Sequence, residues 1–78
     1  MKNFVIYNEV TAQALNNAEL LKALKSQYEH EARIHEAADA ADFAHDWITF
    51  QKLEAEALTV EDNIIYLQRA ADARALAY

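Results

Sequence analysis

The chain of 78 residues contains no cysteine, no glycine and no proline. Without cysteine it can form neither a disulfide nor a thiolate metal site. The lack of glycine excludes the phosphate-binding loops of nucleotide-binding motifs. Glycine and proline also supply most tight turns, so a sheet with short hairpins is disfavoured. No apolar run reaches the roughly 18 residues that span a bilayer, so we expect no membrane segment.

Basic residues are scarce as well. Lysine and arginine number 7 against 13 aspartates and glutamates, which gives a formal net charge of −6. Direct binding to nucleic acid requires lysines and arginines that neutralise phosphates, and none are clustered here, so we expect no such binding. Residues 39–58 hold five acidic residues and one lysine. An acidic surface of this kind either maintains solubility or favours a partner protein with a basic surface.

The first ten residues predict a short arm. Residues 4–7, FVIY, are β-branched and aromatic, a composition typical of a strand. A lone strand must pair its backbone groups with another copy or with a partner's sheet, unless the segment only leads into the first helix. The start MKNFVIYNEV has no small-residue cleavage site, so we expect no signal peptide and a cytoplasmic protein.

From residue 11 onward, residues with high helix propensity dominate. With no glycine or proline to mark breaks, capping-box spacings are the available signals. Three such spacings occur, at Asn16 with Glu19, Asp39 with Asp42, and Thr59 with Asp62. They predict helices at about 17–37, 40–57 and 60–77 in a single all-α domain. The expected architecture is a compact three-helix bundle with a strand-like arm over residues 1–10. In the alternative, residues 17–58 form one rod of about 60 Å that a partner chain would cover.

Each predicted helix has a wide apolar face, which is typical of a globular core. The faces include Leu20, Leu24 and Tyr28 in the first helix, Phe43, Trp47 and Phe50 in the second, and Val60, Ile64 and Leu67 in the third. The three aromatic residues place the second helix at the centre of the core. A chain this short is marginal as a monomer, so a homodimer or larger oligomer is compatible with the sequence.

The stretch HEARIHEAADAADFAHDW, residues 30–47, raises the question of a metal site. Bundle metal sites use Glu-x-x-His pairs, and no such pair occurs in this chain. The separations of His30, His35 and His45 do not fit one face of a helix. The chain has a single serine, Ser26, and little room for a pocket that would tune a catalytic group. We therefore expect no metal, no cofactor and no enzymatic activity, and we interpret the stretch as the join between two helices.

Taken together, these features predict a non-catalytic protein-binding module. Its size and charge are typical of small acidic inhibitors or adaptors, some of them phage- or mobile-element-encoded anti-defence proteins, that mimic nucleic acid on a basic, nucleic-acid-handling surface. Aromatic anchors would add affinity, because tyrosine and tryptophan are common at binding hot spots. The candidate partner-binding residues are Asp39, Asp42, Asp46, Glu54, Glu56, Glu29, Glu31, Glu36, Tyr7, Tyr66 and Tyr78. The alternative is a self-assembling structural or scaffold component joined through its arm and helix faces.

Overall fold

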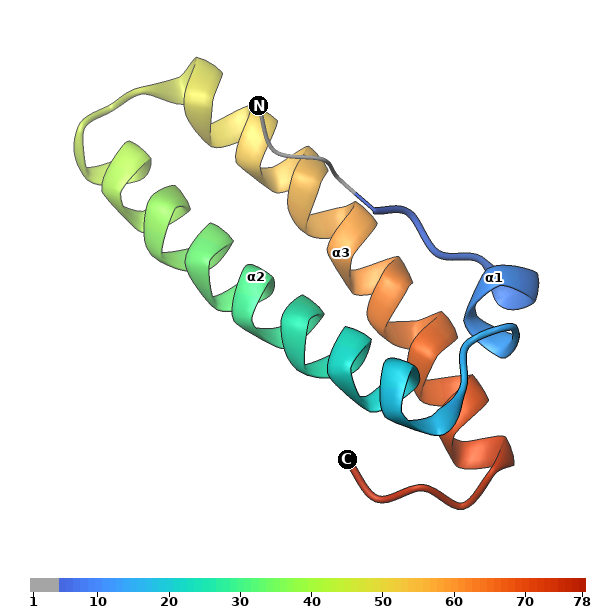
Figure 1. Ribbon diagram of the computed structural model, residues 1–78. Helices are drawn as coiled ribbons and strands as arrows, with labels where there is room; N and C mark the ends of the chain where they lie inside the picture. Colours follow the sequence, from blue (N-terminus) through green and yellow to red (C-terminus); the bar gives the residue numbers. More distant parts are fainter. Residues whose placement is uncertain (1–4) are drawn as a thin grey trace.

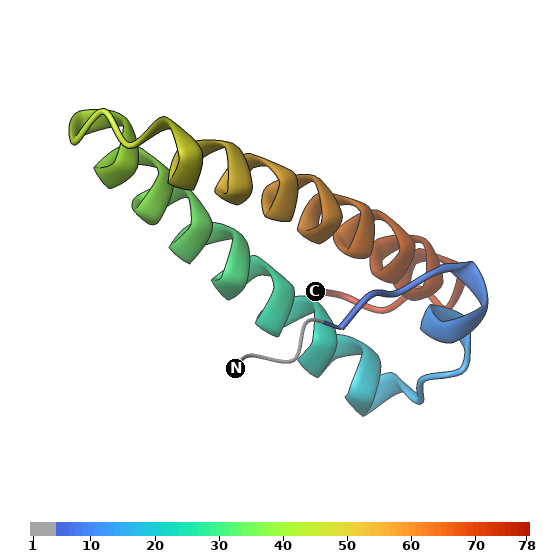
Figure 2. The same cartoon turned by 90° about the horizontal axis from the view of Figure 1, so that it is seen from above.

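The computed structural model describes residues 5–78, which are all-α and 80% helical, with no strand among them (Figure 1). The elements are α1 (Glu9–Gln13), α2 (Asn17–Phe43) and α3 (Trp47–Ala73). The two long helices run side by side in opposite directions, and a short turn joins them (Figures 1 and 2). Helix α1 packs against α3 at the end of this hairpin that lies away from the turn. No helix of residues 5–78 is both long and apolar enough to cross a membrane.

The molecule is more extended than the compact three-helix bundle predicted from the sequence. Its dimensions are 44 × 20 × 20 Å and its radius of gyration is 14.1 Å. A compact domain of this length would have a radius of gyration of about 11.5 Å. The difference arises because α2 and α3 are each 27 residues long, so each extends for about 40 Å.

The predicted start of the first long helix is confirmed. The side chain of Asn16 accepts a hydrogen bond from the Glu19 N–H at 2.8 Å, and the Asn16 N–H donates to Glu19 Oε1 at 2.9 Å. Leu15 and Leu20, on either side of this capping box, pack into one core cluster. A second capping box, between Asn8 and Thr11, begins α1.

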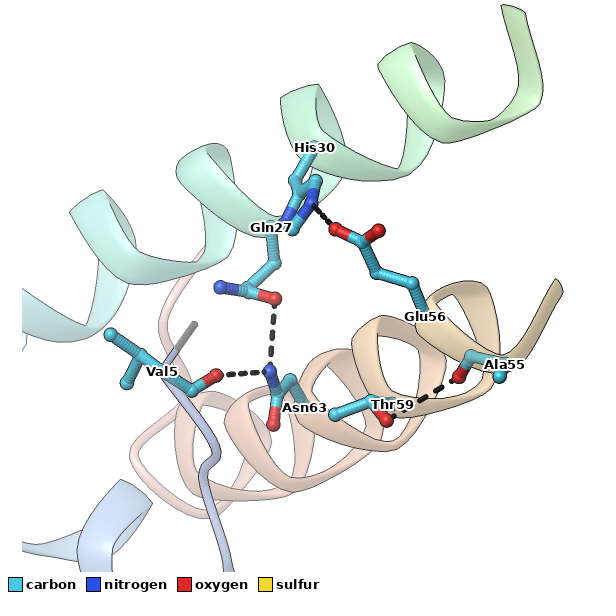
Figure 3. A network of polar contacts seen from close by, with 7 residues as sticks. All are labelled: Val5, Gln27, His30, Ala55, Glu56, Thr59 and Asn63. Carbon is cyan, nitrogen blue, oxygen red and sulfur yellow. Dashed lines mark hydrogen bonds and ion pairs between the residues drawn. The ribbon is translucent and has the colours of Figure 1, made fainter. Parts of the chain in front are cut away.

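The predicted breaks at Asp39 and Thr59 are wrong. Asp39 lies within α2 and Thr59 lies within α3. A spacing of three residues also occurs inside every helix, so an acidic residue three positions after a capping residue does not require a break. Inside α3 the Thr59 hydroxyl donates to the Ala55 carbonyl, which is a normal arrangement for a threonine in a helix interior (Figure 3). The alternative rod over residues 17–58 is also wrong, because the chain reverses direction at residues 44–46.

Both long helices end in Schellman motifs that contain no glycine. At the end of α2, the Asp46 N–H donates to the Ala41 carbonyl and the backbone of His45 is left-handed, with φ of 58°. At the end of α3, the Leu76 N–H donates to the Ala71 carbonyl and Ala75 has φ of 54°. Left-handed backbone costs a non-glycine residue about 1 to 2 kcal/mol, so both ends carry local strain.

The hydrophobic core consists of two clusters along the seam between α2 and α3. The first core cluster, away from the turn, contains Ala12, Leu20, Ala23, Leu24, Leu67, Ala70 and Ala71. The second core cluster, nearer the turn, contains Ile34, Val60 and Ile64. Two polar residues are buried with them: Gln27 lies between the two clusters in the sequence of α2, and Asn63 lies between Val60 and Ile64 of the second core cluster in α3. The Asn63 amide donates to Gln27 Oε1 at 3.1 Å, which satisfies both groups away from water.

Asn63 also holds the N-terminal arm against α3 (Figure 3). Its Nδ2 donates to the Val5 carbonyl at 2.8 Å, and its Oδ1 accepts from the Tyr7 N–H at 2.7 Å. These two contacts reproduce with a side-chain amide the pairing that a neighbouring strand would provide. Residues 5–8 of the predicted arm are not a strand, residues 9 and 10 belong to α1, and residues 1–4 lie outside the described residues.

Candidate interaction surface

The turn end of the molecule comprises residues 39–43 of α2, residues 44–46 and the first turn of α3. Asp46 is the N-cap of α3, and its carboxylate accepts a hydrogen bond from the Thr49 N–H at 3.2 Å. The hydroxyl of Thr49, and then its backbone N–H, favour the charged carboxylate and lower the pKa of Asp46. Asp46 is therefore the helix cap at the join, the role that the sequence had assigned to Asp39 and Asp42.

Large apolar side chains gather on this turn end and are exposed. The exposed fractions are 89% for Phe43, 52% for Trp47 and 71% for Ile48. The Trp47 ring packs edge-on against Phe50, with ring centroids 6.1 Å apart, and lies 5.7 Å from the ring of His45. The prediction that these aromatics form the centre of the core is wrong. Phe43 belongs to α2 and Trp47 to α3, so their spacing in the sequence does not place them on one helix face.

Three of the predicted partner-binding acids also lie at the turn end. Asp39 and Asp42 are exposed near the end of α2, and Asp46 follows them in the turn. Within residues 5–78, the side chains of Asp39 and Asp42 form no hydrogen bond and no ion pair. Asp42 lies in the last turn of α2, where the negative end of the helix dipole disfavours a carboxylate. The local structure therefore gives neither aspartate a stabilising role.

The other predicted acids are spread along the hairpin. Glu29, Glu36 and Glu54 are exposed, and Glu31 is half-buried. Glu56 is engaged within the molecule, because its carboxylate lies 2.7 Å from Nε2 of His30 and links α3 to α2 (Figure 3). These residues do not form one cluster with the aspartates of the turn end.

The predicted tyrosine anchors lie in other parts of the structure. Tyr7 and Tyr66 are half-buried and pack against the first core cluster. Tyr78 is exposed, and its hydroxyl donates to Asp72 at 2.9 Å. That hydrogen bond to the carboxylate raises the pKa of Tyr78. The three tyrosines therefore lie nearer the opposite end of the hairpin from the predicted aspartates.

The histidines of the stretch at residues 30–47 have three different environments. His30 pairs with Glu56, His35 lines a groove between the long helices, and His45 occupies the left-handed position of the turn. Among residues 5–78, no group of three or more histidines and acidic residues could hold a metal ion.

Sequence analysis did not predict the exposure of several large apolar residues. Phe43 and Trp47 were assigned to a buried helix face but are exposed, and Leu58, which is 65% exposed, was not singled out. The sequence did contain a signal for the true start of α3, because Asp46 lies three residues before Thr49. An aspartate can cap a helix by accepting a hydrogen bond from the backbone N–H three residues later. A helix start at residue 47 would have separated Phe43 from Trp47.

No protein-family model, no curated protein and no solved structure matches this chain. The chemistry of the surface is therefore the basis for a functional proposal.

Proposed function

We propose that this chain is a non-catalytic protein-binding module that docks its turn end onto a basic surface of a partner protein. The observation that supports the proposal best is the pairing of two chemistries at one end of the molecule. Exposed Phe43 and Trp47 lie there beside Asp39 and Asp42, whose carboxylates have no partner within the described residues.

The two chemistries would act at different stages of binding. Unpaired carboxylates steer a basic partner toward the turn end and raise the association rate. Buried aromatic side chains then supply affinity, since hot spots are enriched in tryptophan and tyrosine inside a ring of polar contacts. If the partner's basic surface binds nucleic acid, Asp39, Asp42 and Asp46 would occupy phosphate positions. The protein would then act as an inhibitor or adaptor of a nucleic-acid-handling machine.

The placement of Asp42 adds support from stability. A carboxylate in the last turn of a helix faces the negative end of the dipole, and a cation would be more favourable there. Residues that depart from local rules without a compensating contact are often found at functional sites. Lysine at this position would stabilise α2 slightly, so the acidic residue fits a role in binding better than a role in folding.

The test uses two matched pairs of charge reversals. Asp39→Lys/Asp42→Lys changes the turn end, whereas Glu9→Lys/Asp62→Lys makes the same charge change at exposed positions away from the turn end. Each variant and the wild type are immobilised, and proteins captured from the producing cell are identified by mass spectrometry. We expect the wild type and the control pair to capture the same basic protein, and the turn-end pair to lose it.

Salt and competition then test the mechanism. The Debye length falls from about 10 Å at 0.1 M salt to about 3 Å at 1 M, so binding should weaken strongly over this range. Nucleic acid should compete with the protein for the purified partner. A turn-end variant that captures the partner as well as the control pair at low salt would contradict the proposal.

The second candidate function is self-assembly into a structural or scaffold component. The extended shape of the hairpin, with a radius of gyration of 14.1 Å, supports it, because a compact domain of this length leaves less surface uncovered. Sedimentation velocity at increasing protein concentration separates the two candidates. A discrete oligomer that is insensitive to salt and to the turn-end reversals would favour assembly over binding of a basic partner.

A further inference from the structure

An apolar groove of about 280 Å³ lies between α2 and α3, on the half of the hairpin nearer the turn. Buried Ile34 and half-buried Leu53 contribute to its base, and small side chains keep it open at Ala38 and Ala57. Leu58, at its edge, exposes 65% of its surface. The groove therefore presents apolar surface that residues 5–78 do not cover.

On the other side of the same helix pair, a polar contact within the chain bridges the two helices. Ile34 and Leu53 also border a hollow there, but the His30–Glu56 pair joins the two helices across it. The N-terminal arm lies against α3 on its own side, with Ile6 beside Ala55 and Thr59. Among residues 5–78, no hydrogen bond or ion pair joins the residues that line the groove on α2 to those that line it on α3. An additional segment can therefore lie on the groove without breaking a hydrogen bond or an ion pair between its lining residues.

The charges of the groove identify the chemistry of its occupant. Glu54 and Glu61 line it on the α3 side, both are exposed, and neither forms an ion pair within the described residues. They are seven residues apart, two helical turns, so their backbone positions are about 10.5 Å apart along the axis. His35 is the one lining residue that can carry a positive charge. The groove thus combines an apolar base with an acidic edge.

We propose that this groove receives an amphipathic helix of a partner protein, with apolar residues in the groove and lysines or arginines opposite Glu54 and Glu61. This inference rests on the proposed function, because it takes a basic partner protein as given, and it adds the form in which that partner binds. A helix lying in an apolar groove presents anchors at positions i, i+3 or i+4, and i+7. The groove extends over residues 53–61 of α3, so roughly three turns of a helix would cover it.

A second copy of this chain fits the same groove less well. A two-fold dimer places the same patch of each copy at the interface. Glu54 and Glu61 of both copies would then be brought into one contact, and like charges across an interface are unfavourable. The formal net charge of −6 on each chain opposes the same association.

The experiment uses a synthetic probe peptide of roughly 14 residues, about four helical turns, made of leucine, alanine and lysine with all leucines on one helical face. A peptide of the same composition in scrambled order, without an apolar face, is the first control. Affinity is measured by fluorescence anisotropy at low salt. We expect the ordered peptide to bind wild-type protein about tenfold more tightly than the scrambled one, a difference that corresponds to one well-placed apolar contact.

Variants of the protein then locate the site. Leu58→Ser and Glu54→Lys/Glu61→Lys should each weaken binding of the ordered peptide about tenfold, whereas the control pair Glu9→Lys/Asp62→Lys should change it by less than about threefold. Amide shifts in nuclear magnetic resonance spectra should change at Ala38 and Ala57. Equal affinity for the two peptides, or equal weakening by both pairs of reversals, would overturn the inference.

Failure of this inference can be distinguished from failure of the proposed function. Asp39→Lys/Asp42→Lys should bind the ordered peptide within about threefold of the wild type, as the control pair does, because neither aspartate lines the groove. If those reversals abolish capture of the natural partner but the ordered peptide never binds better than the scrambled one, the groove inference alone is wrong. If the ordered peptide binds in the groove but the turn-end reversals leave capture unchanged, the proposed turn-end contact alone is wrong.

Discussion

Replacing Asn63 by alanine should both release the N-terminal arm and destabilise the helical hairpin. Asn63 has no exposed surface, and its amide makes three hydrogen bonds, to the Val5 carbonyl, the Tyr7 N–H and Gln27 Oε1. Each such bond contributes about 1 kcal/mol net, so the substitution should cost about 3 kcal/mol. For a domain of this size, that loss lowers the melting temperature by roughly 12 to 24 °C.

Two measurements separate the two effects. Thermal and urea unfolding followed by far-UV circular dichroism reports the stability of α2 and α3. Hydrogen exchange of the Tyr7 amide reports whether the arm is still held, because that amide donates to Asn63 Oδ1. Gln51→Ala is the matched control, since Gln51 is an exposed amide on the same helix, and it should change the free energy of unfolding by less than about 0.5 kcal/mol.

A double substitution tests the physical reason. In Asn63→Leu, the buried oxygen of Gln27 loses its donor, and such an unsatisfied group costs about 1 to 3 kcal/mol. In Gln27→Leu/Asn63→Leu, both polar groups are gone and the two core clusters become continuous, so the hairpin should recover most of its stability. The Tyr7 amide should still exchange rapidly. The reasoning would be refuted if Asn63→Ala unfolded at the same temperature as Gln51→Ala with the Tyr7 amide still protected.

Three further predictions concern the turn end and the helix ends. Ala75→Gly should raise the free energy of unfolding by about 1 kcal/mol, because Ala75 has φ of 54°, which glycine adopts without strain. Ala32→Gly should lower the free energy of unfolding by about 1 kcal/mol, because Ala32 lies inside α2, where glycine is unfavourable. Urea unfolding measures both changes. Trp47→Ala should cost only about 1 to 2 kcal/mol in the same assay, since the side chain is 52% exposed and its ring packs against Phe50; a cost of about 3 to 5 kcal/mol would indicate a buried ring. Asp46→Asn keeps a side-chain oxygen for the cap but cannot ionise. The folded-state pKa of Asp46 lies below its unfolded value, so the stability that comes from its charge is present above about pH 4. This stability is lost as pH falls through the folded-state pKa. The difference in melting temperature between wild type and variant should therefore shrink between about pH 5 and pH 2.

The sequence was informative wherever a local signal determined the structure. The capping box at Asn16 and Glu19 was predicted because both side chains act on backbone groups three residues away. The third predicted apolar face is buried as expected. Its residues are Val60, Ile64 and Leu67, whose spacing keeps them on one side of α3. These features depend on residues close in the sequence, and distant contacts did not change them.

The position of the chain reversal could not be predicted in the same way. Phe43, Trp47 and Phe50 have the spacing of one amphipathic face, so the sequence favoured a continuous helix through residues 44–46. The actual reversal uses His45 in a left-handed conformation that is uncommon for a residue other than glycine. Such a position depends on tertiary packing rather than on local propensity. The role of Asn63 was also beyond sequence analysis, because its partner Val5 is 58 residues away.

The distribution of stabilising contacts along the hairpin explains why its turn end is available for binding. A pair of helices buries only the seam between them, so other elements must cover the remaining apolar surface. Away from the turn, α1 and partly buried Tyr7, Leu15 and Leu76 pack against the first core cluster. Toward the turn, the core narrows to the second core cluster, and Phe43, Ile48 and Leu58 remain exposed. Apolar surface left exposed beside unpaired carboxylates adds little to stability, whereas a basic, partly apolar partner could bind both. Substitutions near the turn should therefore alter binding more than folding, and substitutions in the first core cluster should do the reverse.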